Sequence, residues 1–214
     1  MSSNRGLKKS SPRNKLQIAV FCSGFGSNLE ALLRAEKKGT LKADVAAIVS
    51  DNPECFALER ARRYRKQAFL FMPQHYNSRQ AYEEIIVRFL RQKKVGLVAL
   101  AGFMRILTPY FVRAFAGKIL NIHPSLLPQF KGARAIRDAF EANAGVTGAT
   151  VHFVTDALDA GPVVLQKEVR RLPRDTRETL ERRIHRAEHQ IYPQAVKLFA
   201  EGKIKSAKGK NGIR

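Results

Sequence analysis

Short apolar runs alternate with segments of helical spacing along nearly the whole chain, and this alternation limits the fold more than any other feature. The apolar runs have the length of buried strands and occupy residues 16–21, 45–50, 68–71, 95–101, 119–122, 150–155 and 163–169. The helical patterns occupy residues 29–38, 55–64, 78–90, 109–114, 133–142 and a C-terminal stretch after Asp175. Because strands that are connected through helices pair in parallel, the pattern predicts an α/β fold. We expect one open, mostly parallel, twisted sheet with helices on both faces.

These segments form one predicted domain over residues 15–202, because no internal repeat and no linker interrupts them. Basic stretches at residues 1–14 and 203–214 flank the domain, and we expect both to be disordered tails.

Two elements carry signals of their own. Residues 95–101 form a continuous apolar run, as expected for a central strand that is covered on both faces. In the C-terminal helix, Asp175 and Glu178 have the spacing of a capping box. Pro193 lies inside the same helical pattern and predicts a kink or a local break, because proline cannot donate the helical hydrogen bond.

The chain is strongly basic, with 39 Lys and Arg residues against 18 Asp and Glu and a net charge of +21. Ten of the basic residues lie in the first 15 and the last 12 positions, where there is no acid. Three interpretations stay open: solvated charge in the tails, contact with nucleic acid, and steering of anionic substrates toward a cleft. The alternation of basic and aromatic residues that is typical of single-strand binding does not occur.

The apolar content of 44% is ordinary for a globular protein. No apolar stretch approaches the roughly 18 residues that a membrane span requires. The N-terminus has no apolar segment after its charges, so we expect no secretory signal. Cys22 and Cys55 have no metal-ligand spacing, and we interpret them as reduced, structural thiols of a cytoplasmic protein.

A carboxamide and an imidazole stand together at the end of one predicted strand, in Asn121 and His123 before Pro124. Imidazole titrates near neutral pH and can transfer a proton or stabilise an oxyanion, and a neighbouring carboxamide can donate to the same oxygen. Further along, the segment 148–162 ends in an acidic loop that could supply a carboxylate partner for the imidazole. The alternative is a turn in which these side chains only satisfy local backbone groups.

The segment 23–28, Ser-Gly-Phe-Gly-Ser-Asn, joins a predicted strand to a predicted helix. Glycine lets the backbone approach an anion, and the free N–H groups of a helix N-terminus attract phosphate. The spacing matches neither the dinucleotide-binding fingerprint nor the Walker loop. The alternative is a tight turn with Ser or Asn as the helix cap.

Together with residues 101–107 and the pair Glu188-His189, these segments resemble the folate-dependent formyltransferases over residues 15–202. The resemblance implies a Rossmann-like formyltransferase fold. It also implies a cytoplasmic enzyme that transfers the formyl group of 10-formyltetrahydrofolate, its co-substrate, to the amine of glycinamide ribonucleotide in de novo purine biosynthesis. No covalent nucleophile and no metal are implied, and we expect a monomer or a homodimer that does not contact a membrane.

The resemblance further assigns roles to single residues. Asn121, His123 and Asp159 are the expected catalytic set: Asn121 donates to the developing oxyanion, protonated His123 stabilises it and supplies a proton to the leaving nitrogen, and Asp159 pairs with the imidazolium. The expected ribonucleotide contacts, the first three at its phosphate, are Gly26, Ser27, Asn28, His185 and Glu188. The expected folate contacts are Arg79, Met104, Arg105, Ile106, Leu107, Asn121, Thr155, Asp156, Ala157, Leu158 and Asp159. His152, on a predicted strand, is expected to support other groups rather than to react.

Two other functions stay open. Residues 132–136 depart from close relatives, which often carry a histidine in place of Arg134 or Ile136. The acceptor could therefore be methionyl-tRNA or an amino sugar nucleotide. A nucleic-acid-binding protein on this scaffold would account for the charge, but such a protein needs neither His123 nor its partners.

Overall fold

The computed structural model describes residues 15–205, which form a seven-stranded sheet. Its strands are β1 (Leu16–Phe21), β2 (Ala43–Ser50), β3 (Ala68–Leu70), β4 (Leu97–Leu100), β5 (Ile119–His123), β6 (Val146–Phe153) and β7 (Val163–Arg170). The strand order is β3-β2-β1-β4-β5-β6-β7. The strands from β3 to β5 pair in parallel, and β6 and β7 are antiparallel additions at one edge. The predicted open, mostly parallel sheet is confirmed.

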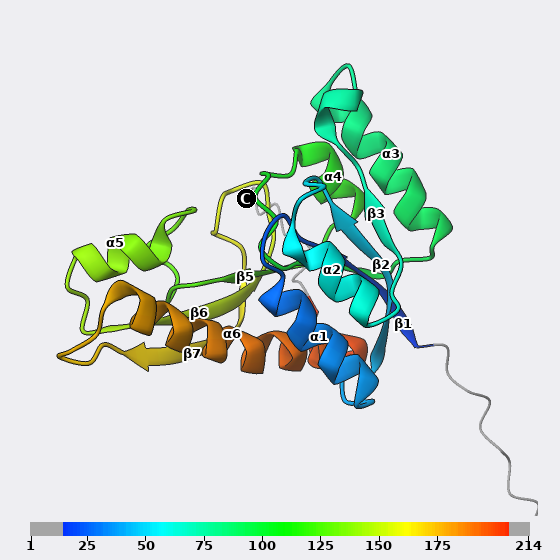
Figure 1. Cartoon of the computed structure of the whole chain (residues 1–214). Coiled ribbons are helices and arrows are strands. Elements are labelled where there is room, and N and C mark those ends of the chain that lie inside the picture. Colours follow the sequence, from blue (N-terminus) through cyan, green and yellow to red (C-terminus); the bar gives the residue numbers. More distant parts are fainter. Residues whose placement is uncertain (1–14, 206–214) are drawn as a thin grey trace, which may run out of the picture.

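The helices cover both faces of this sheet (Figure 1). They are α1 (Ser27–Lys37), α2 (Phe56–Arg63), the 3-10 turn η1 (Pro73–His75), α3 (Arg79–Gln92), α4 (Pro109–Ala114), α5 (Ala135–Glu141) and α6 (Arg177–Ala200). Alternate residues of a strand face opposite sides, so β1 contributes to two cores. Ile18 and Val20 pack toward α1, α2 and α6, whereas Ala19 and Phe21 pack toward α3 and α4. All four are fully buried, so β1 is covered on both faces.

The N-terminus of α6 differs from the prediction. Its cap is Thr176, whose hydroxyl accepts from the Thr179 N–H at 3.3 Å, and not Asp175. The Asp175 carboxylate accepts instead from the Leu172 N–H at 2.6 Å and forms an ion pair with Arg183. The predicted capping box is wrong because these competing donors, one backbone and one charged, occupy Asp175.

Pro193 does not break α6, which continues from Arg177 to Ala200. Contacts on the preceding turn hold the helix in place, since the Tyr192 hydroxyl donates to the carbonyls of Leu100 and Leu120 at 2.8 and 3.1 Å. Ala195, on the following turn, is fully buried. Packing on both sides of Pro193 therefore outweighs the loss of one helical hydrogen bond, and the predicted local break is wrong.

The predicted tail at residues 1–14 and residues 206–214 of the second tail lie outside the described residues. Within residues 15–205, no helix is long and apolar enough to cross a membrane.

Candidate active site

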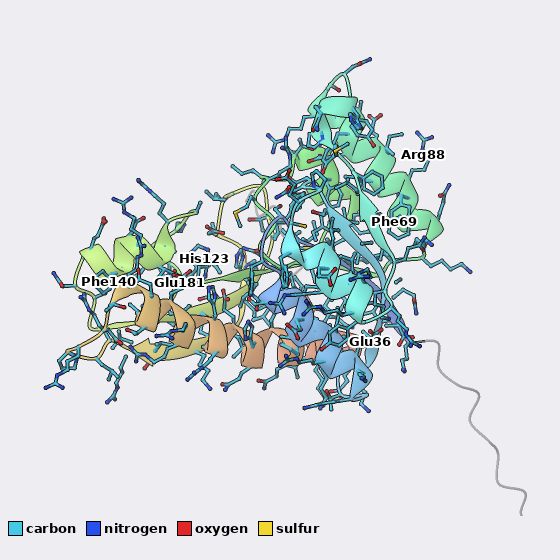
Figure 2. All side chains as sticks on the ribbon, viewed as in Figure 1. Glu36, Phe69, Arg88, His123, Phe140 and Glu181 are labelled. Atoms are coloured by element: carbon cyan, nitrogen blue, oxygen red, sulfur yellow. The ribbon has the colours of Figure 1, made fainter. Side chains whose placement is uncertain are left out.

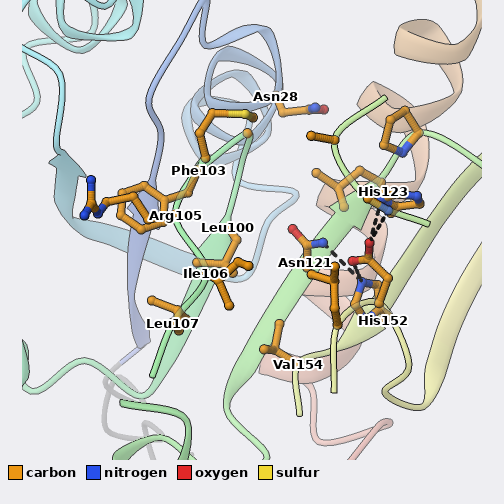
Figure 3. A pocket seen from close by; sticks show the side chains of 18 of the residues that line it. Asn28, Leu100, Phe103, Arg105, Ile106, Leu107, Asn121, His123, His152 and Val154 are labelled. Carbon is orange, nitrogen blue, oxygen red and sulfur yellow. Dashed lines mark hydrogen bonds and ion pairs between the residues drawn. The ribbon is translucent and has the colours of Figure 1, made fainter. Parts of the chain in front are cut away.

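From β1 the sheet extends to one side through β2 and β3, and from β4 it extends to the other side, so the strand order reverses between β1 and β4. Ligand crevices in open α/β sheets form at such switch points. A cavity of about 440 Å³ opens there, beyond the carboxyl ends of β1, β4 and β5. It contains all three predicted catalytic residues, and Figure 3 shows its two walls facing each other. His123 lies inside the molecule at the end of β5, in contrast to Arg88 on the outer side of α3 (Figure 2).

His123 is 4% exposed and both of its ring nitrogens have partners. Nε2 lies 2.8 Å from the Phe130 carbonyl oxygen, and Nδ1 lies 3.5 Å from Asp159 Oδ2. A carbonyl only accepts, so Nε2 carries a hydrogen in every protonation state that keeps this bond. Nδ1, opposite the carboxylate, is therefore the nitrogen that can gain or lose a proton.

Asp159 is held by neighbours from three directions. Its Oδ2 also accepts from the Gly132 N–H at 2.9 Å, and its Oδ1 lies 3.6 Å from His152 Nε2. Burial acts to raise the pKa of Asp159, but the contacts with His152, Gly132 and His123 outweigh it and lower the pKa to about 2. The carboxylate is consequently ionised throughout the neutral range.

Asn121 is oriented by His152, as the dashed lines of Figure 3 indicate. His152 Nδ1 lies 2.9 Å from the Phe153 carbonyl and so carries a hydrogen. Its Nε2 lies 3.1 Å from Asn121 Nδ2 and 3.6 Å from Asp159 Oδ1, so it contacts the carboxamide and the carboxylate together. The carboxamide of Asn121 is thereby held at the wall of the cavity that it lines. This position agrees with the prediction that His152 supports other groups and does not itself react.

The two segments that carry most of the predicted folate contacts, residues 104–107 and 155–159, both line the cavity. Several of their side chains are open to it, with Met104, Ile106 and Leu158 more than half exposed. Arg105 extends over the Tyr82 ring, 5.7 Å from its centroid. Phe103 and Val154 also line the cavity and were missed by the sequence prediction. Each directly precedes a predicted segment, so extending the segments by one residue would have found them.

Arg79 does not line this cavity. It is the exposed first residue of α3, and the Ser78 hydroxyl caps that helix by accepting from the Ala81 N–H. The structure thus separates Arg79 from the other ten predicted folate contacts.

The opposite end of the cavity is polar. Glu188, 3% exposed, accepts from Asn28 Nδ2 at 2.9 Å and lies 2.8 Å from His185 Nδ1, which brings three predicted ribonucleotide contacts together. Ser27 lines an adjoining cavity of about 490 Å³ instead. Gly26 lines neither cavity.

Gly26 is required by the approach of α1 to α2. Its φ is 75°, and an added Cβ would lie 2.7 Å from the Cβ of Ala57. The Gly26 carbonyl accepts the first helical bond of α1, from the Glu30 N–H, so the N–H groups that precede Glu30 have no acceptor within the helix. The turn therefore presents free donors at a helix N-terminus, the arrangement that attracts phosphate.

Among residues 15–205, no group of three His, Cys, Asp or Glu side chains is arranged to hold a metal ion. Cys22 and Cys55 are both buried free thiols.

The chain matches one family model and is similar to several known proteins. The family model for formyl transferase matches residues 16–196. A phosphoribosylglycinamide formyltransferase of Bacillus subtilis is 43% identical over 181 residues, which cover 85% of this chain and 93% of that protein. A trifunctional purine biosynthetic protein of Gallus gallus is 44% identical over 89% of this chain, and the match spans 19% of that longer protein. The crystal structure of glycinamide ribonucleotide transformylase 1 from Symbiobacterium toebii superposes with a TM-score of 0.87, at 44% identity and 94% coverage of both chains.

Proposed function

The chain belongs to the formyl transferase family, and on that premise we propose that its cavity transfers the formyl group of 10-formyltetrahydrofolate to the amine of glycinamide ribonucleotide in de novo purine biosynthesis. The observation that carries this proposal is the convergence of Asn121, His123 and Asp159 between an apolar wall and a polar end of one cavity. An acyl transfer between two bound substrates needs these groups at the junction of two such subsites.

The chemistry begins with attack of the acceptor amine on the formyl carbon. A bond forms between the amine nitrogen and that carbon, and the carbonyl oxygen becomes an oxyanion. The carboxamide of Asn121 donates an N–H to this oxygen, and the imidazolium form of His123 stabilises it electrostatically. Collapse then breaks the bond between the formyl carbon and N10 of the folate.

Protons must move with these bonds. The acceptor nitrogen loses one proton and N10 gains one, so the exchange needs a group that both takes and gives. Nδ1 of His123 suits this exchange, because the Phe130 carbonyl holds the hydrogen on Nε2. Asp159, ionised at neutral pH, stabilises the protonated ring and holds its orientation. The proposed step uses no metal, and we expect a chelator to leave turnover unchanged.

The two ends of the cavity suit the two substrates. A flat pterin fits between residues 104–107 and the opposite wall at residues 155–159, with backbone groups at its polar edge. The ribonucleotide fits the polar end, where Glu188 and His185 face Asn28. Its phosphate is proposed to bind the N-terminus of α1, at Gly26, Ser27 and Asn28. Arg79, which lies outside the cavity, stays a predicted folate contact only.

The remaining assignments follow the same proposal. We place the enzyme in the cytoplasm, as a monomer or a homodimer, with one formyltransferase domain at residues 15–202 between two basic tails. The departure at residues 132–136 lies beside the cavity, since Gly132 and Ala133 line it.

Acceptor identity is tested by following the absorbance of the deformylated folate with one acceptor at a time. We expect turnover with glycinamide ribonucleotide, and none with an amino sugar nucleotide or methionyl-tRNA. Turnover with either of the other acceptors, in place of the ribonucleotide, would show that residues 132–136 have changed the substrate.

A further inference from the structure

We propose that His185 is a positioning residue: held as an imidazolium between Glu181 and Glu188, it fixes the Glu188 carboxylate at the acceptor end of the cavity and makes acceptor binding depend on pH. This inference rests on the proposed function. It concerns the affinity for the ribonucleotide and not the chemical step.

Both ring nitrogens of His185 face carboxylates. Nδ1 lies 2.8 Å from Glu188 Oε2, and Nε2 lies 3.4 Å from Glu181 Oε1. A carboxylate only accepts, and a neutral imidazole carries a single N–H. Only the imidazolium can donate to both, so the geometry by itself favours the charged ring. The hydrogen bond to Glu188 is also the main cause that raises the pKa of His185, against the opposing effect of burial.

Glu188 needs a cation beside it because it is buried. At 3% exposure, an ionised carboxylate is costly unless it is paired and hydrogen-bonded. Its second contact, the Asn28 amide at 2.9 Å, is neutral, which leaves His185 as the group that supplies the charge. Protonated His185 therefore supplies both the positive charge and the N–H that hold the Glu188 carboxylate in place.

This network leaves two acceptor atoms for a ligand. Asn28 and His185 both contact Oε2 of Glu188, and within residues 15–205 its Oε1 makes no hydrogen bond. The Oδ1 atom of Asn28 is likewise buried without a partner among the described residues. Hydroxyl and amine groups of a ribonucleotide are the donors that such a pair of oxygens would take. His185 thus acts on the substrate through Glu188 and, beyond it, through Asn28.

The other titratable groups around His185 do not replace it. His189 stacks beside it with ring centroids 6.5 Å apart. Burial lowers the pKa of His189, Glu188 opposes that shift, and the charge of His185 adds to it, so His189 is the neutral member of the pair. From α1, only the uncharged Asn28 reaches Glu188. Within residues 15–205, none of the charged groups on the other cavity walls forms an ion pair with His185: Arg105, His123, His152, Asp156 and Asp159.

The consequence is a pH-dependent Michaelis constant for one substrate. Below its raised pKa, His185 is charged and Glu188 is held. As the pH rises through that pKa, the ring loses its charge, the ion pair with Glu188 is lost and the KM for the acceptor increases. The KM for the folate should not follow, because its apolar wall is formed by other segments.

The test is steady-state kinetics from about pH 6 to about pH 9 with the wild type, His185→Gln and the control His75→Gln, a variant of an exposed histidine on η1. Glutamine keeps a donor for Glu188 but cannot be charged. At the acid end we expect the acceptor KM of His185→Gln to exceed that of the wild type by about fivefold, because a neutral donor replaces a charged one beside the Glu188 carboxylate. At the alkaline end the two values should converge, with the folate KM unchanged and the His75 variant like the wild type. The substrates titrate in the same way with the wild type and with each variant. Their titration therefore cancels in the ratio of the variant KM to the wild-type KM.

A second variant keeps the test independent of folding around the buried pair. Glu181 is 43% exposed at its side chain, and Glu181→Gln should move the inflection of the acceptor KM to lower pH by weakening the charged state of His185. Parallel acceptor KM profiles for the wild type, His185→Gln and Glu181→Gln would overturn the inference while leaving the proposed function intact. If the wild type shows no acceptor-dependent turnover, the proposed function is contradicted instead. In that case nitrogen NMR of labelled histidines decides: a neutral His185 ring near pH 7 rejects the inference, and a ring protonated on both nitrogens supports it.

Discussion

Burial raises the pKa of Asp159, whereas three neighbouring groups lower it by a larger amount. The pKa of the folded state, about 2, lies below the ordinary value of 3.8. Ionised Asp159 therefore stabilises the fold above about pH 4, and this contribution is lost as the pH falls from about 4 toward about 2.

We expect the contribution to be on the order of 1 to 2 kcal/mol. Urea unfolding of the wild type and Asp159→Asn at about pH 5 and at about pH 2.5 measures it. The difference in unfolding free energy between the two proteins should shrink at the lower pH. A difference that stays constant would mean that Asp159 is not held ionised by His123 and His152.

Gly26 makes a second prediction at the residue scale. Gly26→Ala places a Cβ 2.7 Å from Ala57 and imposes a positive φ on alanine, so unfolding should become easier by about 1 to 3 kcal/mol. The matched control is Gly24→Ala, where an added Cβ meets nothing within 4 Å and stability should change little. Thermal unfolding of both variants compares them. If Gly24→Ala costs as much as Gly26→Ala, the close packing of the turn against α2 is not the cause.

Some site residues could be predicted from the sequence and others could not. The pairing of His123 with Asp159 could be predicted because the resemblance to the formyltransferases assigns both residues, and the acidic loop alone left the choice of carboxylate open. The hydrogen on Nε2 could not be predicted, because the Phe130 carbonyl reaches His123 only through the path of the loop after Pro124. A local pattern shows which groups are available, and the tertiary path of the chain decides their protonation.

At the scale of elements, α6 is held against the sheet through Tyr192. Its hydroxyl donates to Leu100 and Leu120, at the carboxyl end of β4 and within β5. Tyr192→Phe removes the donor from two carbonyls, and we expect a loss of about 1 to 2 kcal/mol in unfolding free energy with kcat retained. Tyr110→Phe is the control, because the Tyr110 hydroxyl makes no hydrogen bond within residues 15–205. Equal stability of the two variants would exclude this role for the Tyr192 hydroxyl.

The same helix explains why some element boundaries escaped prediction. The spacing of Asp175 and Glu178 is a local signal, and it was overridden by Arg183, two turns further along α6. Pro193 was overridden by the buried contacts of its neighbours. The central strands were predicted well because their apolar runs follow from burial on both faces. At the edge of the sheet the prediction is poorer, since β6 begins at Val146, four residues before the predicted run, and β7 is mostly exposed.

At the scale of the whole molecule, the net charge of +21 concerns how substrates and other anions approach. We expect kcat at saturating substrates to survive moderate salt, because the buried groups of the cavity are poorly screened. Retention of nucleic acid by the basic chain should fall steeply over the same range. Turnover and nucleic-acid binding measured in parallel separate the two. Binding that resists salt, with turnover that does not, would favour a nucleic-acid function.

The most direct test of the account is formyl transfer by His123→Ala beside the wild type, with glycinamide ribonucleotide as acceptor and folate binding measured by calorimetry as the control for folding. We expect a fall in kcat of at least about 10²-fold, because alanine has no ring nitrogen to exchange the proton, with folate affinity nearly unchanged. A variant that binds folate and keeps kcat within a few-fold of the wild type would contradict the role of His123.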